Sequence, residues 1–219
     1  VGVPKLMRAI PMLIEIADLG WEPVIGAQVQ GGELLASRFG DGLGMVFGIG
    51  NQSYERQQGR LVLDERLVAD ATQYLFAAYG DRPTRTDLYP QTPNVGLSVA
   101  PRDIMALRAV VSLPGDRRLQ ATVTGVNALP AEPWRRYLPG SWTINLNGVR
   151  PPGETQITVW LPEHAVGPTV TLDGRPLTCS RSGQELRFTA SLHEEANELI
   201  VSWQPRVALQ GNRRALLNY

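Results

Sequence analysis

The sequence predicts a mainly all-β protein with two antiparallel β-sandwich domains in tandem, preceded by one amphipathic helix. Three observations lead to this prediction. Apolar residues recur at helical spacing up to Trp21, and from there the period changes to two. Short strand-like segments are separated by hairpin turns such as Asp173-Gly174 and Ser182-Gly183. The turn sequence Pro114-Gly115-Asp116 divides these segments into two sets of similar length.

The helix is expected within residues 1–20. Its apolar stripe consists of Leu6, Ile10, Leu13, Ala17 and Trp21. Pro11 either kinks this helix or begins a shorter one over residues 11–19, and Gly20 is a natural residue for the position after its end. Other apolar residues widen the stripe. We therefore expect the helix to need a partner surface larger than the sandwich that follows.

The first sandwich domain is expected over residues 21–113. Its predicted strands are 34–39, 43–49, 60–66, 73–79, 95–100 and 104–113. Residues 81–94 are polar and contain three prolines, which predicts a long loop.

The second domain is expected over residues 114–206 and to be immunoglobulin-like. Its predicted strands are 119–126, 141–147, 156–161, 169–172, 177–179, 185–190 and 198–204. The connection 128–140 is rich in proline and aromatic residues. A loosely held tail is expected over residues 207–219.

Composition limits the function classes. Twenty-one basic residues balance 21 acidic ones, so the basic excess of a general nucleic-acid binder is missing. No apolar run approaches the ~20 residues of a membrane span. Cys179 is the single cysteine, which excludes an intramolecular disulfide. His164 and His193 have no metal-ligand spacing and are expected at the surface. We expect no catalytic residue set, no metal site and no cofactor.

The tryptophans are the main candidate site residues. Trp142 and Trp203 share strand faces with aliphatic residues and are predicted to be core. Trp160 falls instead on the face of Thr158. An outer-face aromatic can stack on a sugar ring or cover a neighbouring domain. Trp160 is therefore a candidate for carbohydrate binding, with burial against the other domain as the alternative.

Trp134, Arg135 and Tyr137 form a second candidate, within the connection 128–140. Together they can offer a stacking surface and arginine hydrogen bonds to a carbohydrate. The alternative is a plug between the two domains, with Trp134 buried.

Several segments together resemble one class of enzyme. Residues 16–24 are similar to the end of the last barrel helix in large multidomain glycoside hydrolases, whose catalytic (β/α)8 barrel is followed by β-sandwich domains. Arg38-Phe39-Gly40 and the strand ending in Gly50-Asn51 resemble the first hairpin of such a sandwich, and residues 99–108 resemble its closing strand. Residues 170–177 and 197–203 are similar to accessory sandwiches of carbohydrate-active enzymes.

The resemblance implies an accessory C-terminal region of a glycoside hydrolase. Its role would be to cap the catalytic domain and to contribute to carbohydrate binding. The implied partner is an upstream catalytic domain or chain that packs on the N-terminal helix. An extracellular or periplasmic location is favoured by the resemblance only. The barrel and its carboxylates are absent from this sequence, so no catalytic residue is carried over.

Three alternatives stay open. The chain can be a stand-alone carbohydrate-binding module or an immunoglobulin-like protein-interaction module. The third is a complete enzyme on a β-scaffold, for which no convergent acid and base are readable.

Overall fold

The computed structural model describes residues 13–14, 16–22, 25–64, 72–79, 83–88, 94–114, 117–129 and 133–206, with the side chains of residues 133 and 134 excepted. The predicted all-β class is confirmed: one short helix precedes two antiparallel sheets. The predicted tail 207–219 and the part of the predicted helix before Leu13 lie outside the described residues.

The first sheet, called sheet A, has eight strands among the described residues. They are β1 (Trp21–Glu22), β3 (Leu34–Phe39), β4 (Val46–Asn51), β6 (Thr72–Ala78), β9 (Ile104–Pro114), β12 (Gly153–Trp160), β15 (Cys179–Ser182) and β16 (Glu185–Leu192).

The second sheet, called sheet B, has nine strands there. They are β2 (Ala27–Gln30), β5 (Gln57–Leu63), β7 (Thr84–Leu88), β8 (Asn94–Val99), β10 (Arg118–Val126), β11 (Gly140–Arg150), β13 (Ala165–Leu172), β14 (Arg175–Leu177) and β17 (Ala196–Pro205).

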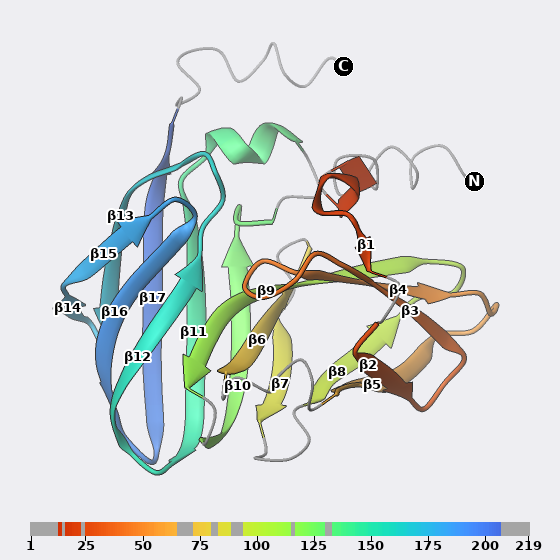
Figure 1. Cartoon of the computed structure of the whole chain (residues 1–219), viewed down its shortest axis with the longest axis horizontal. Helices are drawn as coiled ribbons and strands as arrows, with labels where there is room; N and C mark the ends of the chain where they lie inside the picture. The colour runs from red at the N-terminus through yellow and green to blue at the C-terminus, as the bar shows by residue number, and fades with distance from the viewer. Residues whose placement is uncertain are drawn as a thin grey trace.

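Both sheets continue across residue 114 (Figure 1). One edge of β9 pairs with β4 through residues 104–108 and then with β12 through residues 111–112, while β6 pairs with its other edge. In sheet B, β10 pairs with both β7 and β11. One apolar core lies wholly within residues 34–109, and a second joins residues 119–203 to parts of β6, β7 and β9. The division into domains 21–113 and 114–206, the second immunoglobulin-like, stays a prediction.

Alternation explains why these segments form strands. In β16, residues 186, 188, 190 and 192 are buried, whereas their neighbours face outward. Trp142 and Trp203 are buried in the second core, with ring centres 6.1 Å apart, as predicted. Asp173 and Gly174 both have positive φ, which is the turn geometry that an Asp-Gly pair favours.

The predicted loop over residues 81–94 is wrong in part, because β7 lies within it. Thr84, Thr86 and Leu88 are buried in sheet B, and the charged side chains of Arg85 and Asp87 alternate with them. Threonine suits a pleated strand, and its hydroxyl hides the alternation in a hydropathy pattern. Thr84 Oγ1 accepts a hydrogen bond from the Ala78 amide at 2.9 Å.

The helix ends as predicted but packs through an unexpected side. Residues 13–14 and 16–19 are helical, and Gly20 follows with φ +78°. Ile16, 4% exposed, packs on Val46 and Ala106 on the outer face of sheet A. Ala17 and Leu13 of the predicted stripe face away from the sheet, and Trp21 is in β1, 65% exposed. The helical period of the sequence predicted the wrong side as the packed one, because apolar residues lie on more than one side of this helix.

Candidate functional site

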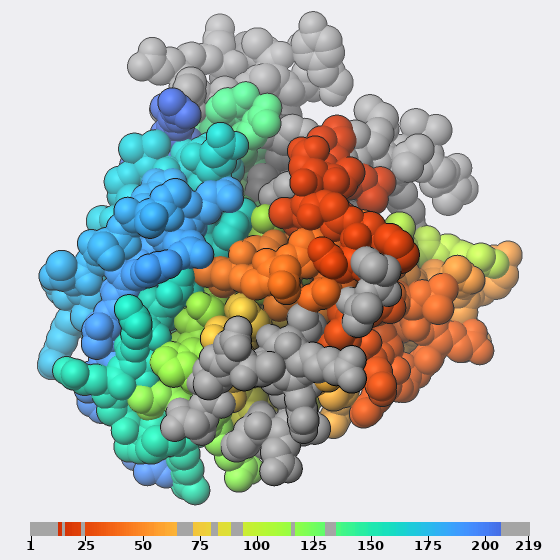
Figure 2. Space-filling view, viewed as in Figure 1, coloured from red at the N-terminus to blue at the C-terminus, as the bar shows by residue number. Residues whose placement is uncertain are grey.

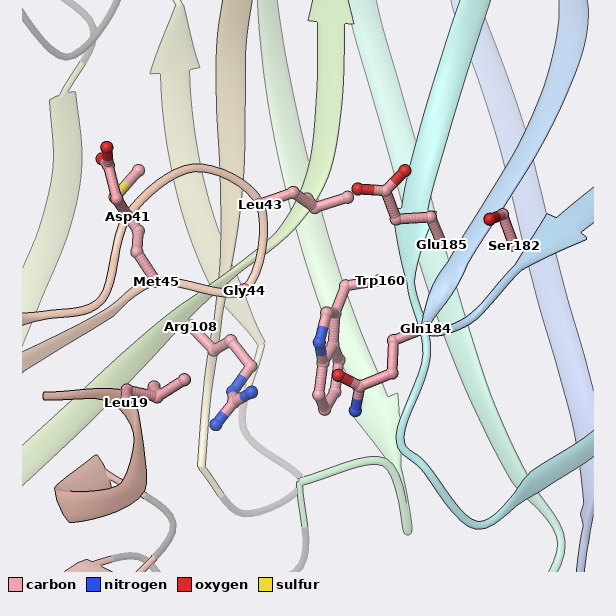
Figure 3. A pocket seen from close by; sticks show the side chains of 10 residues that line it. All are labelled: Leu19, Asp41, Leu43, Gly44, Met45, Arg108, Trp160, Ser182, Gln184 and Glu185. Atoms are coloured by element: carbon pink, nitrogen blue, oxygen red, sulfur yellow. The ribbon is translucent and has the colours of Figure 1, made fainter.

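We call the residues up to 114 the first half of the chain and those after 114 the second half. A cavity of about 430 Å³ opens beside β9, where β4 of the first half and β12 of the second half both pair with that strand. We call this cavity the junction cleft. Residues 41–45, which connect β3 to β4, form one wall, and the turn between β15 and β16 forms the opposite wall. Leu19 at the end of the helix closes a third side. Figure 3 shows side chains from these separate segments around Trp160 and Arg108.

Arg108 and Trp160 are two of the large buried side chains that line the cleft, together with Met45. They are 3% and 5% exposed, and Arg108 Cζ lies 4.3 Å from the centre of the Trp160 ring. Arg108 also donates from Nη2 and Nε to Tyr79 Oη, at 2.7 and 3.2 Å. A desolvated guanidinium over an indole is worth roughly 2 kcal/mol. Arg108 therefore links β9 of the first half to β12 of the second.

The backbone around Trp160 is held from two sides. Trp142 Nε1 donates to the Trp160 carbonyl at 3.0 Å, which ties the end of β12 to β11. Gly44 has φ +96°, and a Cβ there would lie 3.1 and 3.2 Å from Cδ1 and Nε1 of Trp160. Only glycine combines this conformation with so close an approach to the indole.

Trp160 lies on the predicted side of its strand, with Thr158, but it is not exposed. Gly44 and Arg108 of the preceding half cover it. This is the arrangement expected if an outer-face aromatic covers a neighbouring part of the chain. Binding of a carbohydrate by Trp160 stays a prediction.

The charged groups of the cleft contact other charged or aromatic side chains. Arg38 Nη1 donates to Asp41 Oδ1 at 3.2 Å, and Arg187 Nη2 donates to Glu185 Oε2 at 2.5 Å. Asp41 and Glu185 stand on opposite walls (Figure 3). One oxygen of each carboxylate, Oδ2 and Oε1, is not used in these two pairs.

The second candidate, Trp134, Arg135 and Tyr137, belongs to the 3-10 helix η2 (Pro133–Tyr137). The side chain of Trp134 lies outside the described part. Tyr137 is half-buried, and its hydroxyl accepts a hydrogen bond from Arg136 at 3.2 Å. Neither Arg135 nor Tyr137 lines the junction cleft. The structure therefore places Arg135 and Tyr137 outside the cleft of Trp160, and carbohydrate binding at η2 also stays a prediction.

His164 is half-buried, which corrects the expectation of two surface histidines; His193 is exposed. Within the described residues, the shielded Nε2 atom of His164 has no hydrogen-bond partner. Burial lowers the pKa of His164 below its ordinary value, the positive charge of Arg136 lowers it further, and Glu163 opposes both effects. The net effect favours the neutral imidazole.

Two classes of feature are absent from the described part of the chain. No group of three or more His, Cys, Asp or Glu side chains there is placed to hold a metal ion. No described helix has both the length and the apolar character needed to cross a membrane.

The sequence reasoning missed Arg108, Gly44 and Gln184 as parts of this cleft. One signal was present: Arg108 is the single charged residue in the otherwise apolar run 104–111. A lone charge at an interior strand position indicates a specific partner. Gly44 and Gln184 carry no such signal.

No protein-family profile matches this chain, and no curated protein matches it. Two weak structural neighbours are glycoside hydrolase chains. A rhamnosidase from Novosphingobium sp. is 12% identical over 90% of this chain and 22% of its own, with a TM-score of 0.32. A β-porphyranase of glycoside hydrolase family 86 from Bacteroides plebeius is 15% identical over 79% of this chain and 34% of its own, with a TM-score of 0.25. This chain thus spans only between 22% and 34% of the length of these two chains.

Proposed function

We propose that this chain is the accessory C-terminal β-sandwich region of a glycoside hydrolase. Its role is structural: it caps the catalytic domain and holds it through an exposed apolar surface around the N-terminal helix. The support comes from the residues of this chain, and above all from the direction in which the helix faces.

The helix turns its regular apolar side away from the sandwich. Leu13 and Ala17 are both exposed, Leu13 by 41%, and Trp21 follows in β1. We call these three residues the helix stripe. A surface helix normally buries such a stripe and exposes its polar side. This helix is held by Ile16 and Leu19 instead, and its stripe is left available for a second surface.

The apolar surface continues onto sheet A. Leu35 and Ile104 are exposed, and they flank Gly50 in register across β3, β4 and β9. By alternation they share the outer face with the residues that the helix covers. Figure 2 shows the helix and β3, in red to orange, on the same side of the molecule. Contiguous exposed apolar surface of this kind marks interaction sites.

The proposed occupant is the catalytic domain that precedes the helix in the chain. Residues 16–24 resemble the junction between a catalytic barrel and its sandwich. A domain encoded upstream of the helix is held near the helix stripe by the chain itself. The contact then forms intramolecularly, so a modest apolar area suffices to fix the geometry.

The first test is the reading frame upstream of Val1. We expect it to encode a (β/α)8 barrel with two carboxylates at strand ends. A start codon or a signal peptide directly before Val1 would overturn the proposal. A stand-alone module would then be the remaining interpretation.

The second test is calorimetry of the intact protein. We expect Leu13→Ser with Trp21→Ser to uncouple the unfolding of the sandwich region from that of the catalytic domain. The same pair in the isolated chain changes its unfolding temperature little, because both residues are exposed. Tyr54→Ser with Val166→Ser is the matched control at exposed apolar positions elsewhere. Equal behaviour of the two pairs in the intact protein would contradict docking through the stripe.

A further inference from the structure

We infer that the junction cleft binds a neutral, polyhydroxylated ligand of monosaccharide size. This inference goes beyond the capping proposed above and does not depend on it, because every residue it uses lies in the described part of this chain. Three properties of the cleft carry it: its size, the engagement of its charges, and its unused neutral hydrogen-bonding groups.

The size of the cleft fits a small ligand. Its volume of about 430 Å³ lies in the lower part of the range of roughly 300–1,000 Å³ that small-molecule sites occupy. Its walls come from the 41–45 connection and the β15–β16 turn, which β9 and β12 bring together. Leu19 and Leu43 supply apolar surface on which the C–H groups of a ring can pack (Figure 3).

The charges of the cleft argue against a charged ligand. Arg108 is occupied by Tyr79 and by the Trp160 ring, and the two rim carboxylates are paired with Arg38 and Arg187. An anion would meet Asp41 and Glu185 at the rim, and a cation would meet the buried guanidinium below. Both encounters bring like charges together, which repel one another.

The groups with unused capacity are neutral donors. Trp160 Nε1, the Gln184 side-chain amide and Ser182 Oγ line the cleft and have no hydrogen-bond partner among the described residues; Trp160 is buried, whereas Ser182 and Gln184 are exposed. A side chain at position 44 would crowd Cδ1 and Nε1 of Trp160, and glycine avoids this contact. An indole N–H in a largely buried ring normally finds a partner.

The acceptors complete the match to hydroxyl groups. Asp41 Oδ2 and Glu185 Oε1 are not used in the ion pairs with Arg38 and Arg187. Each carboxylate oxygen can accept further hydrogen bonds. A hydroxyl group both donates and accepts. A ring bearing several hydroxyls therefore uses the indole and amide donors together with the carboxylate acceptors, with no net charge required.

The test uses the full chain labelled with ¹⁵N-tryptophan. The five tryptophans contribute five indole N–H resonances, and Trp160→Phe identifies that of Trp160. The probes are D-glucose, D-galactose and L-rhamnose, with sodium acetate as the charged comparison. We expect at least one sugar to move the Trp160 resonance saturably, with a Kd up to about 10 mM. The resonance of Trp21, which is 65% exposed outside the cleft, stays in place.

A matched pair of variants completes the test. Gln184→Ala is expected to weaken sugar binding about three- to tenfold, the loss of one or two hydrogen bonds, with an unchanged urea midpoint. Gln204→Ala, at an exposed position on β17, leaves binding unchanged. The inference is overturned if no sugar moves the Trp160 resonance, if acetate moves it equally, or if Gln184→Ala binds like wild type. None of these outcomes affects the calorimetric test of docking.

Discussion

The outer face of sheet A has two regions of different character. Around β3, β4 and β9 the outward residues are mostly apolar, with Ser37 and Arg108 as exceptions, and Val46 and Ala106 are covered by Ile16 of the helix. Around β12 and β16 most outward residues are polar (Gln156, Thr158, Arg187, Thr189 and Ser191), and the exception is Trp160 at the end of β12, which lies against Gly44 and Arg108. The inner faces of both regions pack into apolar cores. An antiparallel sheet with one buried face commonly presents polar side chains on the other. The sandwich itself does not require the apolar outer face, which therefore points to contacts beyond the sandwich.

The largest difference in unfolding free energy is expected between two charges, one placed in each region of the outer face of sheet A. Val46→Asp puts a carboxylate under the helix, at a fully buried position, and should cost about 4 kcal/mol or more of unfolding free energy. Thr189→Asp, at an exposed position of the polar region, should change it by less than about 0.5 kcal/mol. Urea unfolding measures both.

Val46→Asp can prevent folding altogether. Val46→Thr then replaces it, with an expected loss of about 1–2 kcal/mol from a buried hydroxyl without a partner. Similar losses at Val46 and Thr189 would remove the contrast between the two faces.

The next largest difference in unfolding free energy is expected between substitutions on the two sides of the helix. Ile16→Ala removes the buried anchor and should cost about 2 kcal/mol, the low end for a core isoleucine, because the helix lies at the edge of the fold. Leu13→Ala should cost less than about 1 kcal/mol in the isolated chain, since its side chain is exposed. Hydrogen exchange of the Ala17 and Leu19 amides provides a local readout. A larger loss for Leu13→Ala would mean that the stripe packs on the sandwich.

The contact between the two regions of sheet A depends on Arg108, so its substitution should lower the free energy of unfolding. Arg108→Lys keeps the charge but loses the planar contact with Trp160 and one of the two hydrogen bonds to Tyr79. We expect a loss of about 1–2 kcal/mol in urea unfolding. Arg187→Lys, in an exposed pair with Glu185, should cost less than about 0.5 kcal/mol. Equal losses would show that Arg108 does not link the halves.

The smallest effect is a pH dependence in the second half. The folded-state pKa of His164 lies below its ordinary value of 6.5, so the unfolded chain binds the proton first as pH falls. The stabilising contribution of the neutral imidazole is complete above about pH 6.5 and is lost as pH falls from there toward the lowered pKa. We expect His164→Gln to reduce the difference in urea midpoint between about pH 7.5 and 5.5.

The exposed His193 provides the control, because His193→Gln should leave that difference unchanged. An unchanged difference in the His164→Gln variant would show that the pH dependence arises from other groups.

Most individual strands could be predicted because side-chain alternation is local. β3 matches the predicted 34–39, and β10 and β17 agree to within one or two residues at each end. β7 was missed because its inward positions include Thr84 and Thr86, whose hydroxyls a hydropathy pattern counts as polar. β1 and β2 are two and four residues long, too short for a period to appear.

The candidate site could be predicted only in part. Trp160 was identified as a candidate from the strand face on which it lies. Gly44 and Arg108, which cover it, are more than 50 positions away in the sequence. The helix shows the same limit. Its apolar character was readable, but which side packs depends on where Val46 and Ala106 lie in the sheet.

The sequence by itself determined the all-β class, the turn at Asp173-Gly174, the end of the helix at Gly20 and the burial of Trp142 and Trp203. Each depends on spacing within a few residues, through alternation or through backbone conformations that glycine favours. Only the tertiary structure decided the strand order, the exposed helix stripe and the junction cleft. These depend on which distant strands pair and in what register, and hydrophobic periodicity carries no information about pairing between distant segments.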